Sequence, residues 1–494
     1  CLMTNINCKL HVKHRSISSN AYRTLEFNIL TIPSCVISTK IATVVIGNYN
    51  EKDELYNPFE HRDKKNANSD MGALAHLVKS SLGTGILAMP NAVKNGGILL
   101  GGIGTIIIGI ICAHCVHILV RSSHVLCKRT KTPQMTYAET TEAAFLCGPK
   151  SLRPFANASR IFVNAALCAT YVGGNCVYVV FIATSIKQVA DYHTGSDIPI
   201  RLYILTLIPA VLLLGQVRNL KYMVPFSMAA NISMLVGFAI TLYYIFNGIQ
   251  VAPDVKMVGT LQHIPTFFAT VLFAIEGIGV VSSFLQLSVD RFVTRPYFVM
   301  PVENSMEKPH HFLGCPSVLN ITMTIIVILY TILGVFGYMK YGDAVKGSIT
   351  LNVPIEDVLG QVVQLCLALA VLFTYGLQYF VPLDIMWTSV KEKCSHKYQG
   401  ICQIALRVVM VLVTVVVALL VPELKPFISL VGAIFFSILG ITIPAVVETV
   451  SCWDGHLGNF NWRVWKNGIL IVFSLLALVF GTWISVIEII ELYN

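Results

Sequence analysis

The chain has 494 residues, of which 55% are hydrophobic and 12% are charged, and its mean hydropathy is +0.69. This composition excludes a soluble globular domain and predicts an all-α membrane protein that crosses the lipid bilayer several times. The formal net charge of +9 does not indicate a nucleic-acid partner, because the Lys and Arg residues collect in alternate loops between apolar segments.

Residues 1–70 are polar and basic and show no sustained hydrophobic period, so we expect a disordered cytosolic tail. Its apolar stretch, Phe27–Ile46, contains Pro33 and Lys40 and makes a poor membrane span. Residue 1 is Cys rather than Met, which indicates a fragment or an uncertain gene model. The 14 cysteines lie mostly in apolar segments or in loops assigned to the cytosol, so no extracellular disulfide framework is expected.

From residue 71 onward, apolar segments follow one another, each near the ~20 residues that cross the hydrocarbon layer. We predict about eleven such helices. Their ranges are 72–93, 98–120, 157–187, 199–216, 223–247, 264–281, 316–338, 358–381, 402–421, 428–449 and 467–489. The membrane domain 71–494 would contain a first repeat at 72–247, an inverted second repeat at 264–449, and an extra helix at 467–489.

The distribution of Lys and Arg among the loops predicts the orientation. The loops after the second, fourth, eighth and tenth predicted helices hold most of them: Arg121, Lys128, Arg129, Lys131, Lys150, Arg153, Arg218, Lys221, Lys391, Lys393, Lys397, Arg463 and Lys466. The opposite loops hold fewer: Lys94, Lys256, Lys340, Lys346 and Lys425. We therefore expect a cytosolic N-terminus and, with an odd number of helices, an extracellular or lumenal C-terminus.

The first predicted helix, within Met71–Asn95, is interrupted by Gly83-Thr84-Gly85. Glycine costs about 1 kcal/mol in a helix interior relative to alanine. In lipid, a loosened backbone is tolerated only where it lines a cavity or is buried in protein. The alternative is a glycine-rich face for helix packing. Polar residues crowd the same segment and favour a functional role: His76, Lys79, Ser80, Ser81 and Thr84.

The sixth predicted helix, Pro265–Val281, is similar in design: Gly277 and Gly279 interrupt it beside the carboxyl group of Glu276. The first and sixth helices are five spans apart, so two five-helix units would have opposite orientations. Broken helices at matching positions of inverted repeats are typical of a transport site near the membrane midplane.

An amino acid would suit such a site. Its carboxylate would bind the free backbone N–H groups around Gly83, Thr84 and Gly85, where the helix dipole favours an anion. Its ammonium group would bind carbonyl oxygens of the opened sixth helix: Phe273, Ala274, Glu276 and Gly277. Ser80, Ser81 and Thr84 either contact the solute or bond to the carbonyl one turn earlier.

His76 is the candidate for carrying a coupled proton, because histidine changes charge between about pH 5 and 8; the alternative is a neutral histidine bonded to a neighbouring helix. Glu276 is the second candidate. It could supply charge, stay protonated in its buried setting, or hold its helix in place by a hydrogen bond. Lys79 is expected to pair with an acid or to extend toward the cytosolic side.

Two further polar stripes mark faces turned toward the helix bundle. Tyr171, Asn175 and Tyr178 share one face of the third predicted helix, and Tyr375 and Gln378 share one face of the eighth. Each stripe either lines the pocket or packs the scaffold. The chain has no GxxxxGK[ST] and no HExxH motif. We therefore expect no enzyme, no metal site and no cofactor, with the proton as the coupling ion.

Several segments resemble the proton-coupled amino acid transporters of the solute carrier 36 family, and the likeness is greatest to insect members. They include HLVKSSLGTGILAMPNAVKNGG (76–97), FAIEGIGVV (273–281), MPVENSMEKPHHFLG (300–314), KGSITLNVP (346–354) and GTWISVIEII (481–490). The resemblance implies the inverted-repeat fold of amino acid–polyamine–cation transporters and symport of small neutral amino acids with a proton. It also implies a proton role for His76 and, for some members, a lysosomal location.

The chain departs from the family pattern at three places. Segment 282–299 separates GIGVV from MPVEN, which would rebuild the second half of the sixth helix if it is present in the protein. Residues 1–50 do not resemble a family tail. Cys176 matches one member of an outer cysteine pair found in some relatives, but Lys340 stands where the other would be.

These observations predict a proton-coupled symporter of small neutral amino acids in the plasma membrane or the lysosomal membrane. A first alternative is a lysosomal amino acid sensor that signals to a growth kinase through a cytosolic nutrient-signalling complex. A second is a vacuolar-type exporter with different ion coupling.

Overall fold

The computed structural model describes residues 56–61, 69–81, 83–217, 224–248, 250–281, 303, 306–314, 317–391, 393–453, 457 and 459–493. The chain divides into two compact units, Cys1–Asn48 and Tyr49–Asn494, and all described residues belong to the second. Most of the predicted tail lies outside the description. Its residues Pro58–His61 form a 3-10 helix, η2, whose Phe59 ring packs edge-on against His124 at 5.0 Å, so this part is ordered.

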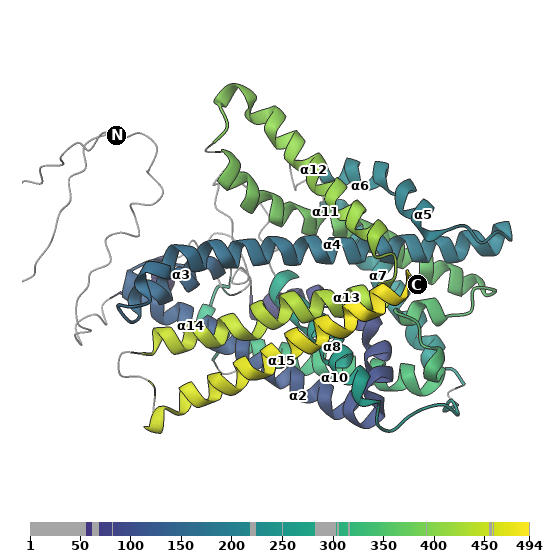
Figure 1. The fold of residues 1–494 in the computed structure, drawn as a ribbon, viewed down its shortest axis with the longest axis horizontal. Helices are drawn as coiled ribbons and strands as arrows, with labels where there is room; N and C mark the ends of the chain where they lie inside the picture. Colours follow the sequence, from purple (N-terminus) through teal and green to yellow (C-terminus); the bar gives the residue numbers. More distant parts are fainter. Residues whose placement is uncertain are drawn as a thin grey trace, which may run out of the picture. The chain divides into compact units, whose positions relative to one another are not determined.

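The described residues form an all-helical fold, as predicted (Figure 1). The first half contains α1 (Asp70–Ser81), α2 (Thr84–Thr130), α3 (Tyr137–Cys147), α4 (Ala156–Thr194), α5 (Ile200–Thr206), α6 (Ile208–Gly215) and α7 (Val224–Phe246). The second half contains α8 (Ile264–Val281), α10 (Val318–Tyr341), α11 (Val358–Lys391), α12 (Gln399–Leu420), α13 (Leu424–Val431), the π-helix η11 (Gly432–Thr442), α14 (Ile443–Ser451) and α15 (Trp462–Glu491).

Within the described part of the chain, 8 helices are long and apolar enough to cross a membrane. Two further apolar helices, Ile200–Gly215 and Leu261–Ile275, are shorter. The protein is therefore a multi-pass membrane protein, while the predicted count of eleven spans and the inverted repeat stay predictions. Part of the difference in count arises because α2 runs without a loop from the end of the first predicted span through the second.

Gly97 divides α2 in place of that expected loop. Its backbone has φ +77°, and a Cβ atom there would lie 2.6 Å from the Gly259 nitrogen. The chain after α7 pairs with this turn: the amide of Gly259 donates to the Gly96 carbonyl at 2.8 Å, and that of Leu99 to the Met257 carbonyl at 2.9 Å. Only glycine combines a left-handed backbone with so close an approach.

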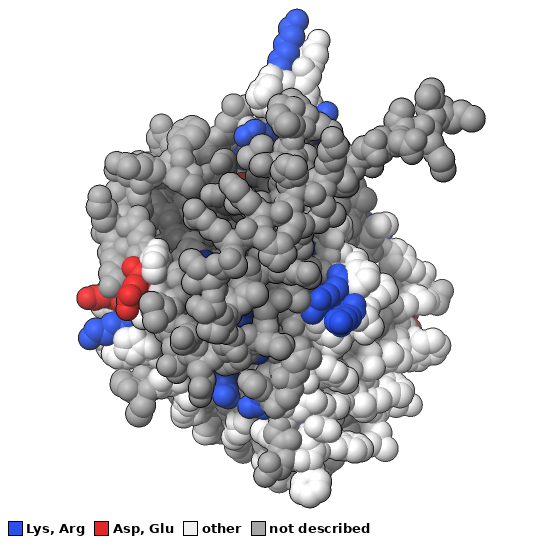
Figure 2. All heavy atoms as spheres, turned by 90° about the vertical axis from the view of Figure 1, so that its left-hand side faces the viewer, with Lys and Arg blue, Asp and Glu red and all other residues white. Residues whose placement is uncertain are grey.

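The predicted cytosolic loop at 121–153 is largely helical. α2 extends to Thr130, and α3 begins with a capping box in which Thr136 and Glu139 bond to each other's backbone amides. The Tyr137 hydroxyl of α3 donates to the Leu439 carbonyl of η11 at 2.5 Å. Figure 2 views the end of the molecule at which α3 lies, where blue Lys and Arg side chains appear at several places.

The helices pack around α2, α8 and α4. α2 packs along α10 and α8, α4 along α11, and α8 also on η11 and α15. In Figure 1, α13, η11 and α14 follow one line beside α15. At Gly432 of η11, a Cβ atom would lie 2.0 Å from the Ala269 carbonyl oxygen of α8, so these two backbones are in direct contact.

The predicted interruption of the sixth helix is misplaced. α8 stays helical through Gly277 and Gly279 to Val281. A glycine only lowers helix stability, and packing of the flanking turns can outweigh a cost of about 1 kcal/mol per residue. Any opening of this helix therefore lies beyond Val281, outside the described residues.

Candidate functional site

The first helix is broken where the sequence predicts. α1 ends at Ser81 and α2 begins at Thr84, and Gly83 between them is extended, with φ −125° and ψ −155°. The Gly83 amide donates to the Ser81 carbonyl at 2.8 Å. Among the described residues, a Cβ atom on Gly83 would have no neighbour within 4 Å, so these residues leave open space beside the start of α2. The first amides of α2 have no partner within their own helix, and they lie beside this space.

The two glycines of the break have different roles. A Cβ atom on Gly85 would lie 2.8 Å from the Ala274 Cα and 3.2 Å from the Ala274 carbonyl oxygen. Gly85 therefore lets the start of α2 touch the backbone of α8. The sequence analysis treated Gly83 and Gly85 together as one interruption of the helix. Of the two, only Gly83 faces open space among the described residues.

Tyr330 of α10 joins the two candidate helices and was not predicted. Its hydroxyl donates to the Ser81 carbonyl at 2.5 Å and lies 3.3 Å from the Ala274 carbonyl. The side chain is completely buried. The signal in the sequence was a phenol in the middle of the apolar segment 316–338, which holds a second one, Tyr338, at its end; a buried tyrosine hydroxyl usually finds a partner.

The stripe on α4 lies at the same site. Tyr178 is hydrogen-bonded to the Gln378 side chain of α11, and it lies close enough to Tyr330 for the two phenols to interact. Asn175 is completely buried, and neither its amide nitrogen nor its amide oxygen has a hydrogen-bond partner among the described residues. Tyr171 is buried on the same helix. Asn175 therefore offers a donor and an acceptor within the core.

Tyr375 belongs to the scaffold. Its hydroxyl lies 3.1 Å from the Thr414 hydroxyl on α12, and its ring stacks on Tyr379 at 5.7 Å. The Tyr379 hydroxyl donates to the backbone carbonyl of Arg407, whose guanidinium donates to the Gly215 carbonyl at 2.8 Å. The α11 stripe is thus divided: Gln378 reaches α4, and Tyr375 ties α11 to α12.

Two aromatic rings join α8 to η11 next to Ala274 in the sequence. Phe273 of α8 packs edge-on against Phe436 of η11 at 5.7 Å, and both are buried. Ser81 directs its hydroxyl to the Leu77 carbonyl of its own helix at 2.9 Å, so only its carbonyl is presented to Tyr330. Thr84 is buried at the start of α2.

The structure does not test five of the predicted site residues. His76, Lys79 and Ser80 belong to α1, and Glu276 and Gly277 belong to α8. Beyond their helical backbone, these residues lie outside the description. Among the residues that are described, no group of three or more His, Cys, Asp or Glu is arranged to hold a metal ion.

A buried charged cluster ties together α2, α14 and α15 away from the break. The Lys466 ammonium donates to the Glu448 carboxylate at 2.6 Å and lies 2.9 Å from the Nε2 atom of His114. Because a lysine ammonium only donates, Nε2 of His114 accepts in this arrangement. The sequence analysis used Lys466 only for orientation, and the predicted site did not include this cluster.

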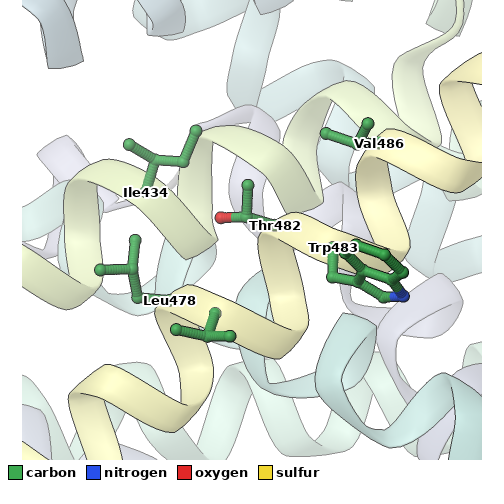
Figure 3. A pocket seen from close by; sticks show the side chains of 6 residues that line it. Ile434, Leu478, Thr482, Trp483 and Val486 are labelled. Atoms are coloured by element: carbon green, nitrogen blue, oxygen red, sulfur yellow. The ribbon is translucent and has the colours of Figure 1, made fainter.

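An open apolar depression in the described part of the chain lies away from the break. It has a volume of about 350 Å³ between η11 and α15 (Figure 3). Its lining is apolar except for one hydroxyl: Ile434, Leu478, Val479, Thr482, Trp483 and Val486. A zwitterion would leave both of its charges unpaired there. By contrast, the break combines backbone donors at the start of α2 with an acceptor at the Ala274 carbonyl, which suits a small molecule carrying both charges.

Comparisons with known proteins found a matching family and curated relatives. A family described as "Transmembrane amino acid transporter protein" matches residues 67–287 and 296–487, and the gap falls inside segment 282–299. The chain is 40% identical over 439 residues to "Proton-coupled amino acid transporter-like protein pathetic" of Drosophila melanogaster, covering 89% of each chain. It is 23% identical over 436 residues to "Probable amino acid transporter skat-1" of Caenorhabditis elegans, covering 85% of this chain and 90% of that protein.

Among solved structures, the chain is similar to the inward-facing conformation of Mhp1. The TM-score is 0.48 at 13% identity, and the match covers 88% of this chain and 91% of that one. A closed conformation of Mhp1, a nucleobase-cation-symport-1 family transporter with bromovinylhydantoin bound, matches with a TM-score of 0.44 at 13% identity, covering 88% of this chain and 94% of that one.

Proposed function

The chain belongs to the transmembrane amino acid transporter family, and from this premise we propose that it carries small neutral amino acids across a membrane together with a proton. It is an amino acid transporter and not an enzyme, as the sequence analysis predicted. The nature of the substrate and the coupling ion are the parts that are proposed.

The observation that carries the proposal is the break between α1 and α2 at Gly83, where a Cβ atom would meet no described atom within 4 Å. The substrate carboxylate would bind the free amides of α2, where the helix dipole favours an anion. The amino group would bind main-chain carbonyls, of which Ala274 is the nearest on α8.

The surroundings of the break favour a small neutral side chain. Tyr330 is completely buried between the end of α1 and α8, and Phe273 and Phe436 are buried where α8 packs on η11. The side chains described there, which also include Thr84, Tyr178 and Gln378, carry no formal charge. A charged substrate side chain would therefore find no oppositely charged partner among these described side chains, and burying a charge without one is strongly unfavourable.

For the proton, His76 on α1 is the first candidate and Glu276 on α8 the second. His76 is five residues before Ser81, and Glu276 is two residues after Ala274, so each lies within about one and a half helical turns of a contact described above. The name of the Drosophila relative, which calls it a proton-coupled amino acid transporter-like protein, supports coupling to a proton. We place the basic end seen in Figure 2 in the cytosol, in accordance with the positive-inside rule.

The test is alanine-evoked current in oocytes with confirmed surface expression, measured at about pH 5.5 and about pH 7.5 with and without sodium. The full chain and a variant lacking 282–299 are compared. Current that grows at acid pH without sodium supports proton symport, and loss of this growth in His76→Ala supports the proton role of His76. A current that depends on sodium would instead indicate sodium, rather than a proton, as the coupling ion. Alanine binding without current would favour the sensor, whose output is a signal to a cytosolic complex.

A further inference from the structure

The Tyr330 hydroxyl lies where two backbone carbonyls converge. Its oxygen is 2.5 Å from the Ser81 carbonyl oxygen and 3.3 Å from that of Ala274. Ser81 is the last residue of α1, and Ala274 lies within α8, so the phenol of α10 contacts both candidate half-sites. The side chain is completely buried, which fixes the position of this oxygen.

Counting hydrogens shows what this arrangement lacks. A phenol has one hydrogen to donate and two lone pairs to accept with. At 2.5 Å the phenol donates its one hydrogen to the Ser81 carbonyl, which also accepts from the Gly83 amide at 2.8 Å. The Ala274 carbonyl, at 3.3 Å, therefore keeps a free lone pair toward Tyr330, and Tyr330 keeps lone pairs of its own.

A primary ammonium group fits this pattern of acceptors. It has three N–H donors and a positive charge, so it can donate to the Ala274 carbonyl and to the Tyr330 oxygen at once. Tyr330 meanwhile continues to donate to Ser81. Hydrogen bonds from a charged donor are shorter and about twice as strong as neutral ones.

We propose that the Tyr330 oxygen and the Ala274 carbonyl together bind the amino group of the substrate, so that Tyr330 is a substrate-binding residue that selects for primary amino groups. This proposal rests on the proposed function and adds a ligand from α10. A purely structural role, in which the phenol only caps the end of α1, would make no distinction between kinds of amino group.

The experiment compares two isomers of the same size and charge. 2-Aminoisobutyrate has three N–H groups on its ammonium, whereas N,N-dimethylglycine has one. Each is used as a competitor of radiolabelled alanine uptake by the full chain, by Tyr330→Phe and by Tyr338→Phe. Tyr338 is a suitable control because it is also completely buried on α10, but its hydroxyl accepts from the Lys256 amide at 3.0 Å.

We expect Tyr330→Phe to weaken binding of 2-aminoisobutyrate about 10- to 100-fold, the range for a hydrogen bond to a charged group, and that of N,N-dimethylglycine less than about twofold. Tyr338→Phe should leave the binding of both isomers unchanged. Equal losses for the two isomers, or no loss for either, would overturn the proposal while leaving amino acid transport intact. Absence of alanine uptake by the unmodified chain would instead contradict the proposed function.

A second measurement covers the case in which Tyr330→Phe does not reach the surface. The purified wild-type protein is heated with each isomer at the same concentration, because a ligand raises the unfolding temperature according to its affinity. Greater stabilisation by 2-aminoisobutyrate supports the proposal. Equal stabilisation by the two isomers contradicts it.

Discussion

Gly85 and Ala274 are in backbone contact: a methyl group on Gly85 would lie 2.8 Å from the Ala274 Cα. Real Cβ atoms do not approach other carbons so closely, so this contact requires glycine. It holds the start of α2 against α8 and thereby sets the spacing between the two helices that would bind the substrate. Gly83, two residues earlier, has no such neighbour.

The first prediction concerns these two glycines. Gly85→Ala should force α2 and α8 apart, lower the free energy of unfolding by about 1–3 kcal/mol, and abolish alanine uptake. Gly83→Ala should leave stability unchanged or raise it by about 0.4–1 kcal/mol, because φ −125° suits alanine. It should still reduce uptake, because the methyl group enters the open space. Thermal unfolding of purified protein and uptake at matched surface expression check both; a fully active Gly85→Ala would refute the contact.

The second prediction concerns the turn at Gly97. Gly97→Ala places an L-residue at φ +77° and brings its Cβ to 2.6 Å from the Gly259 nitrogen. Gly195→Ala is the control for a positive φ: Gly195 has φ +65° and ψ +16°, in the αL region, where Gly97 has ψ +168°, and no described atom would lie within 4 Å of its Cβ. The control should cost about 1–2 kcal/mol for the backbone conformation alone.

Gly97→Ala should cost about 1–3 kcal/mol more than the control, because the chain at Val258 and Gly259 must move. It should also increase hydrogen exchange at the Leu99 and Gly259 amides, which bond across this turn. Equal unfolding temperatures for the two variants would show that the close approach is not maintained in the protein.

The third prediction concerns the pair Lys466–Glu448, whose side chains are 18% and 9% exposed. Removing one member leaves the other charge buried, which typically costs about 3–5 kcal/mol. Lys466→Met and Glu448→Gln should each lower the unfolding temperature strongly, and the double variant should recover most of the loss.

Lys256→Met provides the comparison, because its pair with Asp343 is 55% and 40% exposed and should matter little. Differential scanning fluorimetry in one detergent measures all four variants. If the double variant is as unstable as the sum of the two single ones, the two side chains do not act as a pair.

Sequence patterns alone predict the class of this protein and the place of its first break. Hydropathy and the length of the apolar segments indicate a multi-pass helical membrane protein, because lipid requires each span to satisfy its own backbone. The break at Gly83 could be predicted because a glycine next to a β-branched residue destabilises the helix locally, within one turn, and so depends only on neighbouring residues in the sequence. The interruption predicted at Gly277 and Gly279 was wrong, because α8 stays helical through both residues to Val281; a glycine lowers the stability of a helix by only about 1 kcal/mol.

The tertiary structure decided which polar residues meet. Tyr330, Ser81 and Ala274 are far apart in the sequence, and no helical period connects them. Tyr178 and Tyr375 looked equivalent as members of polar stripes, yet one hydroxyl meets Gln378 and the other Thr414. Periodicity reports which face of a helix is buried, whereas the partner of that face depends on how distant helices pack, and this is a property of the folded chain only.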